Sequence, residues 1–488
     1  MTATATPAAS RLIEAGSRPV SAASLAFFRI AFGLAMIVNT WLYIPLLVRE
    51  YYVDTSFPFP YPPLTFVAPL PGIGMHVLYV AMSLTGLLIA LGLWYRLAVA
   101  TFFVLHTYVF LIDSTYFQNH EYLIGLLAFL MIFLPAHRMW SLDARRRPRV
   151  AGSTVPAWMV WLLRFQIGVP YFYGGIAKLN ADWLAGEPLR MWLERRTHIE
   201  LIGPLFTNEA VVWVMNFGSL VFDLVVVWFL LHPRTRLGAF IVACCFHLIN
   251  VRLFGLFIFP WLMIFGTTIF FRPDWPLQVE AWWSRRRQRG AAKPVPAGLG
   301  GPPETSGKPS RLGGPTAVGD PDTAPLAHSY GGSATPNIRR QLLVAALAGW
   351  VAVQLLLPLR HYAIAGDPSW TEQAHRFAWH MKLRDKQGTA TFHVTPSDGA
   401  GFTVDPYDHL SSTQAFLMAG HPSRIVQFAH HLSELHGGAE VRAETSVSLN
   451  GREPVPLVDP TVDLAAVPLW WWGNAEWILP LDEPLRRD

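Results

Sequence analysis

Hydrophobic residues gather in long blocks along the first three-quarters of the chain, and polar residues fill the intervals between them. Blocks of about 20 apolar residues match the length of a helix that crosses the hydrocarbon core of a bilayer. The pattern predicts about nine such helices, at residues 22–48, 73–94, 97–112, 122–136, 157–177, 210–231, 237–250, 253–271 and 341–358. We therefore predict a mainly α fold, a polytopic membrane helix bundle.

Arginines predict how this bundle is oriented. The segments after the fourth, sixth and eighth predicted helices are rich in arginine, and such segments usually face the cytoplasm. They contain Arg138, Arg145, Arg146, Arg147 and Arg149, then Arg234 and Arg236, then Arg272, Arg285, Arg286, Arg287 and Arg289. We expect a cytoplasmic N-terminus over residues 1–21, with 113–121, 178–208 and everything after 360 outside. The first block has no cleavage site of small residues after it, so we expect a retained signal anchor.

The remaining polar stretches divide the chain further. Residues 291–336 contain nine prolines and nine glycines, which indicates a flexible linker inside a basic cytoplasmic segment, 276–340. The segment 276–340 follows a transmembrane domain over 22–275 and precedes the last helix, at 341–360. In 361–488 the runs Thr389–Val394 and Glu440–Leu449 alternate as strands do. Because Asn450-Gly451 follows the second run, we expect a hairpin there and a small β-containing extracytoplasmic domain.

Composition supports the membrane assignment. Hydrophobic residues make up 52% of the 488 and charged residues only 15%, against about 25% in soluble domains. The net charge of +5 is explained by the arginines of the short loops, so we expect a lipid bilayer and no nucleic acid as partner. We find no HExxH, paired CxxC, P-loop or GxSxG motif, which argues against metal, phosphate and serine-nucleophile chemistry.

Three charged residues fall inside predicted helices, where ionisable groups are costly and often functional. They are Arg29, Arg164 and Asp223. We expect Arg29 or Arg164 to pair with Asp223 and hold helices together.

Lys178 follows an apolar aromatic run and a Gly-Gly pair at the outer membrane face. A lysine held there loses hydration, its pKa falls, and it can act as a neutral base. The alternative is an interfacial lysine that reaches the lipid headgroups. On the same outer side, His120 could bind a ligand or cap the fourth helix, next to Asn119. His247 and Asn250 are three apart and so share a helix face.

In their order and spacing these segments resemble the vitamin K-dependent γ-glutamyl carboxylases and their bacterial relatives, the HTTM (horizontally transferred transmembrane) proteins. The resemblance covers most of residues 20–275 and is strongest at 178–183, KLNADW. Its other segments are 23–29 (ASLAFFR), 92–96 (GLWYR), 119–129 (NHEYLIGLLAF), 141–143 (SLD) and Phe246-His247 with Asn250.

The resemblance implies a membrane enzyme of the carbon–carbon lyase class. It would couple oxygenation of reduced vitamin K, a phyllo- or menahydroquinone, to carboxylation of a glutamyl side chain, with O2 and CO2 as co-substrates and no metal. It further implies that Lys178 deprotonates the hydroquinone and that His120 assists, while Asn119, Tyr173, His247 and Asn250 contact the cofactor. The glutamyl γ C–H is too weak an acid for any amino-acid base, so the cofactor must supply a stronger one.

Residues 369–384 (SWTEQAHRFAWHMKLR) resemble the glutamate-binding region of this family. Trp379 is retained, while Arg384 and Lys386 stand where the family has a histidine and an arginine. Both cations can hold a carboxylate, although lysine lacks the bidentate fork. Should 379–386 form a strand, the two would share a face. Otherwise they belong to an exposed charged turn. The other candidate contacts to a glutamate-containing protein or peptide are His375, Arg376 and Arg195.

Two other functions fit the same sequence. One is a quinol-oxidising, epoxide-forming membrane protein without carboxylase activity. The other is a non-enzymatic scaffold or transporter in which Lys178 and His120 serve topology and packing. The basic residues lie at outer helix ends and not near the membrane midplane, which argues against transport.

Overall fold

A computed structural model describes residues 7–200, 202–291, 338–469 and 475–485. It consists of two compact units, the first formed by Met1–Gln278 with Gln354–Asp488 and the second by Val279–Val353. Each of the nine predicted segments is helical. They correspond to α2 (Ala23–Leu46), α3 (Gly74–Leu91), α4 (Tyr95–Ile112), α5 (Asn119–Phe133), α7 (Ala157–Ala177), α10 (Glu209–Leu231), α11 (Arg236–Phe254), α12 (Phe259–Thr267) and α14 (Ile338–Leu356).

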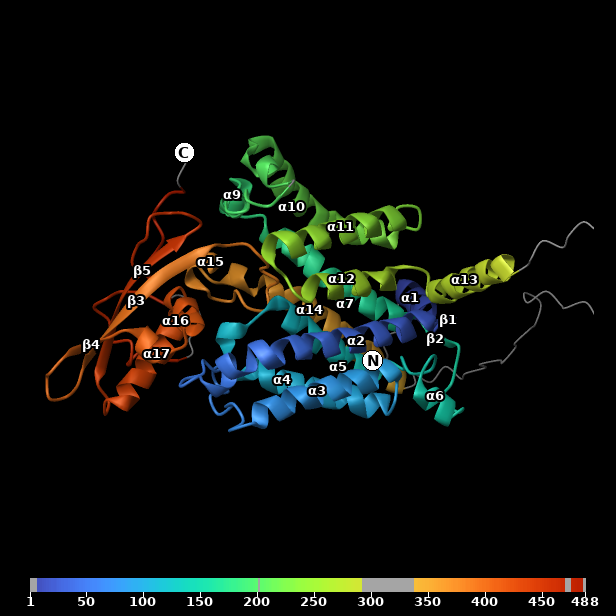
Figure 1. Cartoon of the computed structure of the whole chain (residues 1–488), viewed down its shortest axis with the longest axis horizontal. Coiled ribbons are helices and arrows are strands. Elements are labelled where there is room, and N and C mark those ends of the chain that lie inside the picture. Colours follow the sequence, from blue (N-terminus) through green and yellow to red (C-terminus); the bar gives the residue numbers. More distant parts are fainter. Residues whose placement is uncertain (1–6, 201, 292–337, 470–474, 486–488) are drawn as a thin grey trace, which may run out of the picture. The chain divides into compact units, whose positions relative to one another are not determined.

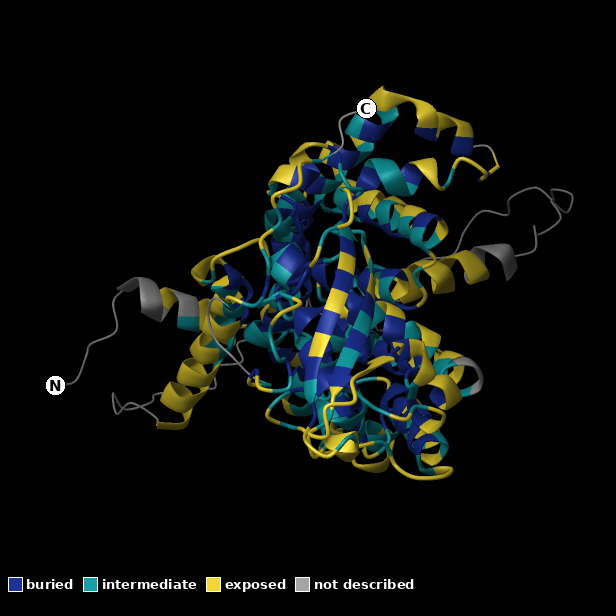
Figure 2. Cartoon of the chain, turned by 90° about the vertical axis from the view of Figure 1, so that its left-hand side faces the viewer, coloured by how far each residue is buried: buried dark blue, intermediate teal, exposed yellow. Residues whose placement is uncertain are grey.

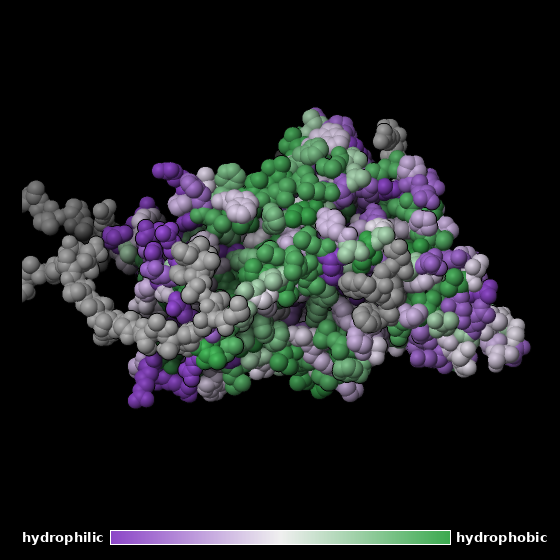
Figure 3. Space-filling view, turned by 180° about the vertical axis from the view of Figure 1, so that it is seen from behind, coloured by the Kyte–Doolittle hydropathy of each residue, from purple (hydrophilic) through white to green (hydrophobic). Residues whose placement is uncertain are grey.

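Six of these helices are long and apolar enough to cross a membrane by length and composition, counted over the described residues. They are α2, α3, α4, α10, α11 and α14. Of the other three, α5 and α12 are shorter, and α7 contains Arg164, Gln166 and Pro170. The protein is therefore an integral membrane protein, and its described residues contain six candidate spans and three further apolar helices. Figure 3 shows hydrophobic surface over the middle of one face and hydrophilic residues towards its two ends.

Small elements occupy the arginine-rich end of the first unit. They are α1 (Pro7–Ser17), α6 (Leu142–Arg146) and a two-stranded ribbon of β1 (Pro19–Ser21) with β2 (Thr154–Pro156). The ribbon ties the N-terminal segment to the loop before α7. Helix α13 (Trp275–Ala291) stands where the flexible basic segment was predicted to begin. The Pro/Gly-rich linker predicted at 291–336 lies outside the described residues, apart from Ala291 at the end of α13.

The C-terminal part contains the predicted β structure. Its sheet has the order β4-β3-β5, all antiparallel, with Lys386 of β3 opposite Leu449 of β5. The strands are β3 (Lys386–Thr395), β4 (Phe402–Val404) and β5 (Glu440–Leu449), and two helices, α16 (Ser412–Ala419) and α17 (Pro422–Leu435), pack with them (Figure 1). Buried and exposed residues alternate along β5 (Figure 2), because successive side chains point to opposite faces. Both predicted strands are thus confirmed.

The prediction that β5 forms a hairpin with the chain after Asn450-Gly451 is wrong, because β5 pairs with a different strand. Asn450 and Gly451 have positive φ angles, 52° and 78°, and turn the chain as such pairs do. However, β5 pairs along its length with β3, and the chain after the turn contacts β5 through an isolated bridge between Val447 and Val455 and single hydrogen bonds such as that from Leu464 to the Val441 carbonyl. Helix α17 was not predicted, although its buried residues Ile425, Phe428, Ala429 and Leu432 recur at helical spacing.

Shorter elements connect these parts. They are the helices α8 (Ala181–Leu184), α9 (Leu189–Glu194) and α15 (Pro368–Thr371), the π-helical turn Arg49–Val53, and the 3-10 turns Ser114–Tyr116, Gly203–Thr207, Thr268–Phe270, Leu357–Ala363 and Pro406–Asp408.

The three regions predicted to lie outside contact one another. In the loop before α5, the Asp113 carboxylate accepts a hydrogen bond from Gln414 of α16 at 2.9 Å. In the segment after α7, Asp182 pairs with Arg452 at 2.7 Å, just beyond β5. All three regions therefore lie on one side of the helices, as the topology prediction requires.

The predicted pairing of Arg29 or Arg164 with Asp223 is wrong. Arg29 donates to the backbone carbonyls of Ile89 and Ala90, both at 2.8 Å, in the last turn of α3. Arg164 donates to the carbonyls of Ile269 and Phe271. Both arginines satisfy carbonyls at helix ends, where the backbone lacks partners and the helix dipole favours a cation.

Candidate active site

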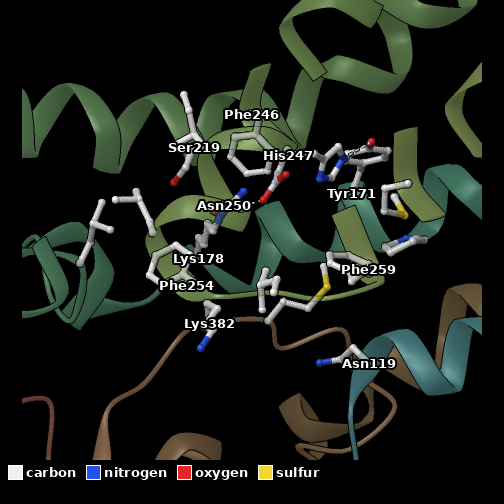
Figure 4. A pocket seen from close by; sticks show the side chains of 18 of the residues that line it. Asn119, Tyr171, Lys178, Ser219, Phe246, His247, Asn250, Phe254, Phe259 and Lys382 are labelled. Atoms are coloured by element: carbon white, nitrogen blue, oxygen red, sulfur yellow. Dashed lines mark hydrogen bonds and ion pairs between the residues drawn. The ribbon is translucent and has the colours of Figure 1, made fainter. Parts of the chain in front are cut away.

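An apolar cavity of about 670 Å3 lies between α5, α7, α10, α11, α12 and the chain at residues 380–382 (Figure 4). Five of the six residues predicted to act on or bind the cofactor line it: Lys178, His120, Asn119, His247 and Asn250. Most of the other lining residues are apolar, among them Phe246, Phe254, Phe259, Met215 and Met263. The structure therefore gathers around one space residues that lie more than 100 positions apart in the sequence.

Lys178 follows the last residue of α7 and is almost fully buried. Its Nζ donates to Oδ2 of Asp223 on α10 at 2.6 Å and lies 5.0 Å from the centre of the Trp183 ring. The side chains of Lys178 and Asp223 are 7% and 8% exposed. Lys178 therefore does not reach towards headgroups, and its partner is the carboxylate that we had expected to pair with an arginine.

Two glycines bring α7 close to this ion pair. A Cβ atom at Gly175 would lie 2.7 Å from Cγ and 2.9 Å from the backbone nitrogen of Leu224, next to Asp223. At Gly174 it would lie 3.5 Å from Asp223 Oδ2. Small residues allow helices to approach closely in membranes. Here that approach lets Lys178 reach Asp223.

We expect Gly175→Ala to push α7 away from α10 and to lower stability by about 1–3 kcal/mol, as overpacking does. Because the ion pair depends on this approach, any activity that needs Lys178 should fall as well. The measurement is thermal unfolding in detergent. Gly238→Ala in α11 is the control, because a Cβ there meets nothing within 4 Å. Equal stability of the two variants would contradict the close-packing argument.

Tyr171, and not the predicted Tyr173, lines the cavity from α7. Its hydroxyl lies 2.7 Å from Nε2 of His247 and 3.1 Å from Oγ1 of Thr267. The Tyr173 hydroxyl donates instead to the Leu355 carbonyl. Residues two apart point in different directions on a helix, whereas seven residues are nearly two full turns. The spacing between Tyr171 and Lys178 was thus the signal that could have identified Tyr171.

His120 lies in the first turn of α5 but does not cap it, since the N-cap residue is Gln118. His120 Nε2 lies 3.4 Å from Oε1 of Glu121, and the same carboxylate accepts a hydrogen bond from Asn39 at 3.2 Å. The neighbouring Asn119 donates to the backbone carbonyl of His380 at 3.0 Å. His120 is therefore held at the cavity wall by a partly buried carboxylate that the sequence analysis did not single out.

The predicted substrate cations meet one carboxylate, but it belongs to the chain itself. Arg384 Nη2 lies 2.7 Å and Lys386 Nζ 3.5 Å from the carboxylate oxygens of Glu372. The Glu372 side chain is only 3% exposed. Neither cation lines the cavity, and neither forms an exposed charged turn.

The other predicted substrate residues lie around the same cluster or outside it. His375 and His380 are joined through their Nδ1 atoms at 2.8 Å, and Arg376 donates to Ser114 Oγ at 3.2 Å. Trp379 is fully buried, and its ring centre lies 5.1 Å from that of Tyr122. Arg195 forms an ion pair with Asp385 at 2.6 Å. The segment 379–385 is not a strand, and the residues that do reach the cavity are His380, Met381 and Lys382.

Burial lowers the pKa of His380 from 6.5 to about 3, and the nearby His361, Arg384 and Arg360 add to this. Since the folded-state pKa lies below the unfolded value, only the unfolded chain takes up this proton between these two pH values. Stability is therefore complete above pH 6.5 and decreases as the pH falls towards 3. At about pH 5 we expect this one group to lower the free energy of unfolding by about 2 kcal/mol relative to neutral pH. The test is to measure the unfolding of the wild type and of His380→Gln at pH 7.5 and at pH 5. The variant should lose less stability than the wild type when the pH is lowered.

Comparison with known proteins identifies the larger part of the chain. Residues 17–275, more than half of the 488, match the family model described as the HTTM domain. The chain belongs to the HTTM family. Residues 339–484 match the model of the vitamin K-dependent gamma-carboxylase, lumenal domain. No solved structure matches the chain significantly.

The two matches confirm the resemblance to the carboxylase family. This HTTM protein is a vitamin K-dependent carboxylase-like membrane enzyme, with an extracytoplasmic C-terminal part. The cavity lies where its two matched regions meet: residues between 118 and 263 come from the HTTM domain, and 380–382 come from the lumenal domain. Within the described ranges, no group of three or more His, Cys, Asp or Glu side chains could hold a metal ion.

Proposed function

We propose that this protein is a vitamin K-dependent γ-glutamyl carboxylase-like enzyme of the lyase class. It would couple epoxidation of a naphthohydroquinone by O2 to carboxylation of a glutamyl side chain of a protein or peptide. In this proposal the N-terminus is cytoplasmic and the cavity opens towards the extracytoplasmic side. The observation that carries the proposal is the buried Lys178–Asp223 pair in the wall of a largely apolar cavity.

The cavity suits a lipid-soluble quinol. Its volume of about 670 Å3 falls within the range of about 300–1,000 Å3 usual for small-molecule sites. Aromatic rings of Phe246, Phe254 and Phe259 provide apolar contact, while Asn250 and His247 provide a few polar groups. When bound, the hydroquinone would supply the oxygen-dependent chemistry that no side chain can perform.

Lys178 and Asp223 can share one proton. With Nζ and Oδ2 only 2.6 Å apart and both side chains buried, transfer of that proton to Oδ2 would leave Nζ neutral. We propose that Nζ, so released, accepts a hydroxyl proton from the hydroquinone.

His120 stands beside this site as the second proton carrier of the proposal. Its Nε2 lies 3.4 Å from Oε1 of Glu121, which holds the ring at the cavity wall. The surrounding apolar side chains would exclude water and so protect a strongly basic intermediate from protonation.

A second candidate is quinol oxidation without carboxylation. It is favoured by the contacts of Arg384 and Lys386 with Glu372, because a carboxylate of the chain itself already occupies the predicted glutamate-binding cations. The two candidates differ only in whether carbon dioxide is fixed.

The test is to incubate purified protein in lipid with a naphthohydroquinone, O2, labelled bicarbonate and a Glu-containing peptide. Epoxide and fixed label are measured separately. We expect both products. Epoxide without label would support the second candidate, and neither product would refute both and leave a scaffold or transporter.

A further inference from the structure

Lys382 lines the cavity and forms no ion pair with any residue that the structure describes. It lies on the C-terminal segment, which runs below the helices that carry Lys178 and Phe254 in Figure 4. The other lysine of the cavity, Lys178, is paired with Asp223. Among the described residues no carboxylate forms an ion pair with Lys382, and the residue is exposed. An incoming anion could therefore reach it.

The acidic residues on the same segment are already engaged. Asp385 accepts hydrogen bonds from Nε1 of Trp192 at 2.9 Å and from Arg195 at 2.6 Å. Glu372 is held by Arg384 and Lys386. Arg195, Arg384 and Lys386 thus already contact carboxylates of the fold, whereas Lys382 forms no ion pair in the described part of the chain.

Two aromatic rings flank the Lys382 ammonium group. Its Nζ lies 5.3 Å from the centre of the Phe254 ring and 5.9 Å from that of Trp192. Both rings also line the cavity. Cation–π contacts orient an ammonium group but leave its charge unneutralised. The rings also offer apolar surface to the methylene groups of a short acidic side chain.

The backbone around Lys382 has positive φ angles, a left-handed conformation that residues other than glycine disfavour. Lys382 has φ 49°, and Phe377 and Trp379 nearby have φ 62° and 60°. Left-handed conformations of non-glycine residues cost about 1–3 kcal/mol each and cluster at functional sites. At Lys382 this conformation places a cation at the cavity.

We propose that Lys382, with Trp192 and Phe254, forms the subsite that binds the carboxylate of the glutamyl side chain. The inference rests on the proposed function for the identity of the ligand. It replaces Arg384 and Lys386 in that role, because those two cations contact Glu372 and do not line the cavity. With its carboxylate at Lys382, the side chain would extend into the same cavity that contains Lys178.

Direct binding tests the subsite without reference to turnover. A fluorescent peptide with one Glu, and its matched Gln version, are titrated against the full-length protein in lipid nanodiscs. We expect the wild type to prefer the Glu peptide. Lys382→Met, which keeps the length but removes the charge, should weaken Glu-peptide binding at least about tenfold and leave Gln-peptide binding unchanged.

Two further variants complete the test. Lys382→Arg should restore the preference for Glu, because it restores the charge. Arg442→Met, which removes an exposed cation of the same domain, should behave as the wild type. The proposal is overturned if the wild type does not distinguish the two peptides, or if Lys382→Met binds the Glu peptide as tightly as the wild type. If binding follows our expectation but no epoxide or fixed label forms, the proposed function fails and the carboxylate subsite stands.

Discussion

Lys178→Arg is expected to abolish naphthohydroquinone epoxidation while leaving the fold in place. Arginine can keep the ion pair with Asp223, which lies 2.6 Å from the lysine nitrogen. It cannot give up its proton in a protein, so it cannot act as a base. Loss of a general base usually costs about 10²–10⁴-fold in rate. Epoxide formation by purified wild type and variant is the measurement.

Lys178→Ala is a harsher change and needs a matched control. It leaves the Asp223 carboxylate buried without its partner, which is destabilising by itself. In the double variant with Asp223→Asn the charges are balanced again, so stability should recover while epoxidation stays absent. Thermal unfolding separates the two effects. An active Lys178→Arg enzyme would show that Lys178 serves only as a positional cation, and the base would have to lie elsewhere.

Glu372→Gln is expected to destabilise the C-terminal domain strongly. This carboxylate is 3% exposed and faces Arg384 and Lys386, with His421 Nε2 at 3.8 Å. Removing one partner of a buried ion pair leaves uncompensated charge and costs about 3–5 kcal/mol. For a domain of this size that corresponds to a fall in unfolding temperature of roughly 10–20 °C.

The control for this change is Glu440→Gln. Glu440 forms an exposed ion pair with Arg442, of the kind worth about 0–1 kcal/mol. A second variant, Glu372→Gln with Lys386→Met, removes one of the stranded cations and should regain part of the loss. If Glu372→Gln unfolds at the same temperature as the Glu440→Gln control, the Glu372 carboxylate does not hold this cluster together.

Much of the fold could be predicted from local sequence. Block length predicted the helices, because a bilayer of fixed thickness demands about 20 apolar residues. Alternation predicted β3 and β5, because strand side chains alternate between faces. The positions of Lys178, His120 and His247 came from the order and spacing of short segments that resemble a known family. These features depend on residues near one another in the chain.

Pairings between distant segments were decided only by the tertiary structure. Asp223 lies 45 residues from Lys178, and which cation it meets depends on the rotation of α10 and on the close approach that Gly175 permits. Glu372 reaches Arg384 and Lys386 through an irregular segment whose left-handed residues no periodic pattern predicts. Local sequence decides which chemical groups the protein has and on which elements they lie. Packing decides which partner each buried cation finds, a carboxylate for Lys178 and backbone carbonyls for Arg29, because a buried charge needs hydrogen bonds or an opposite charge wherever the fold provides one.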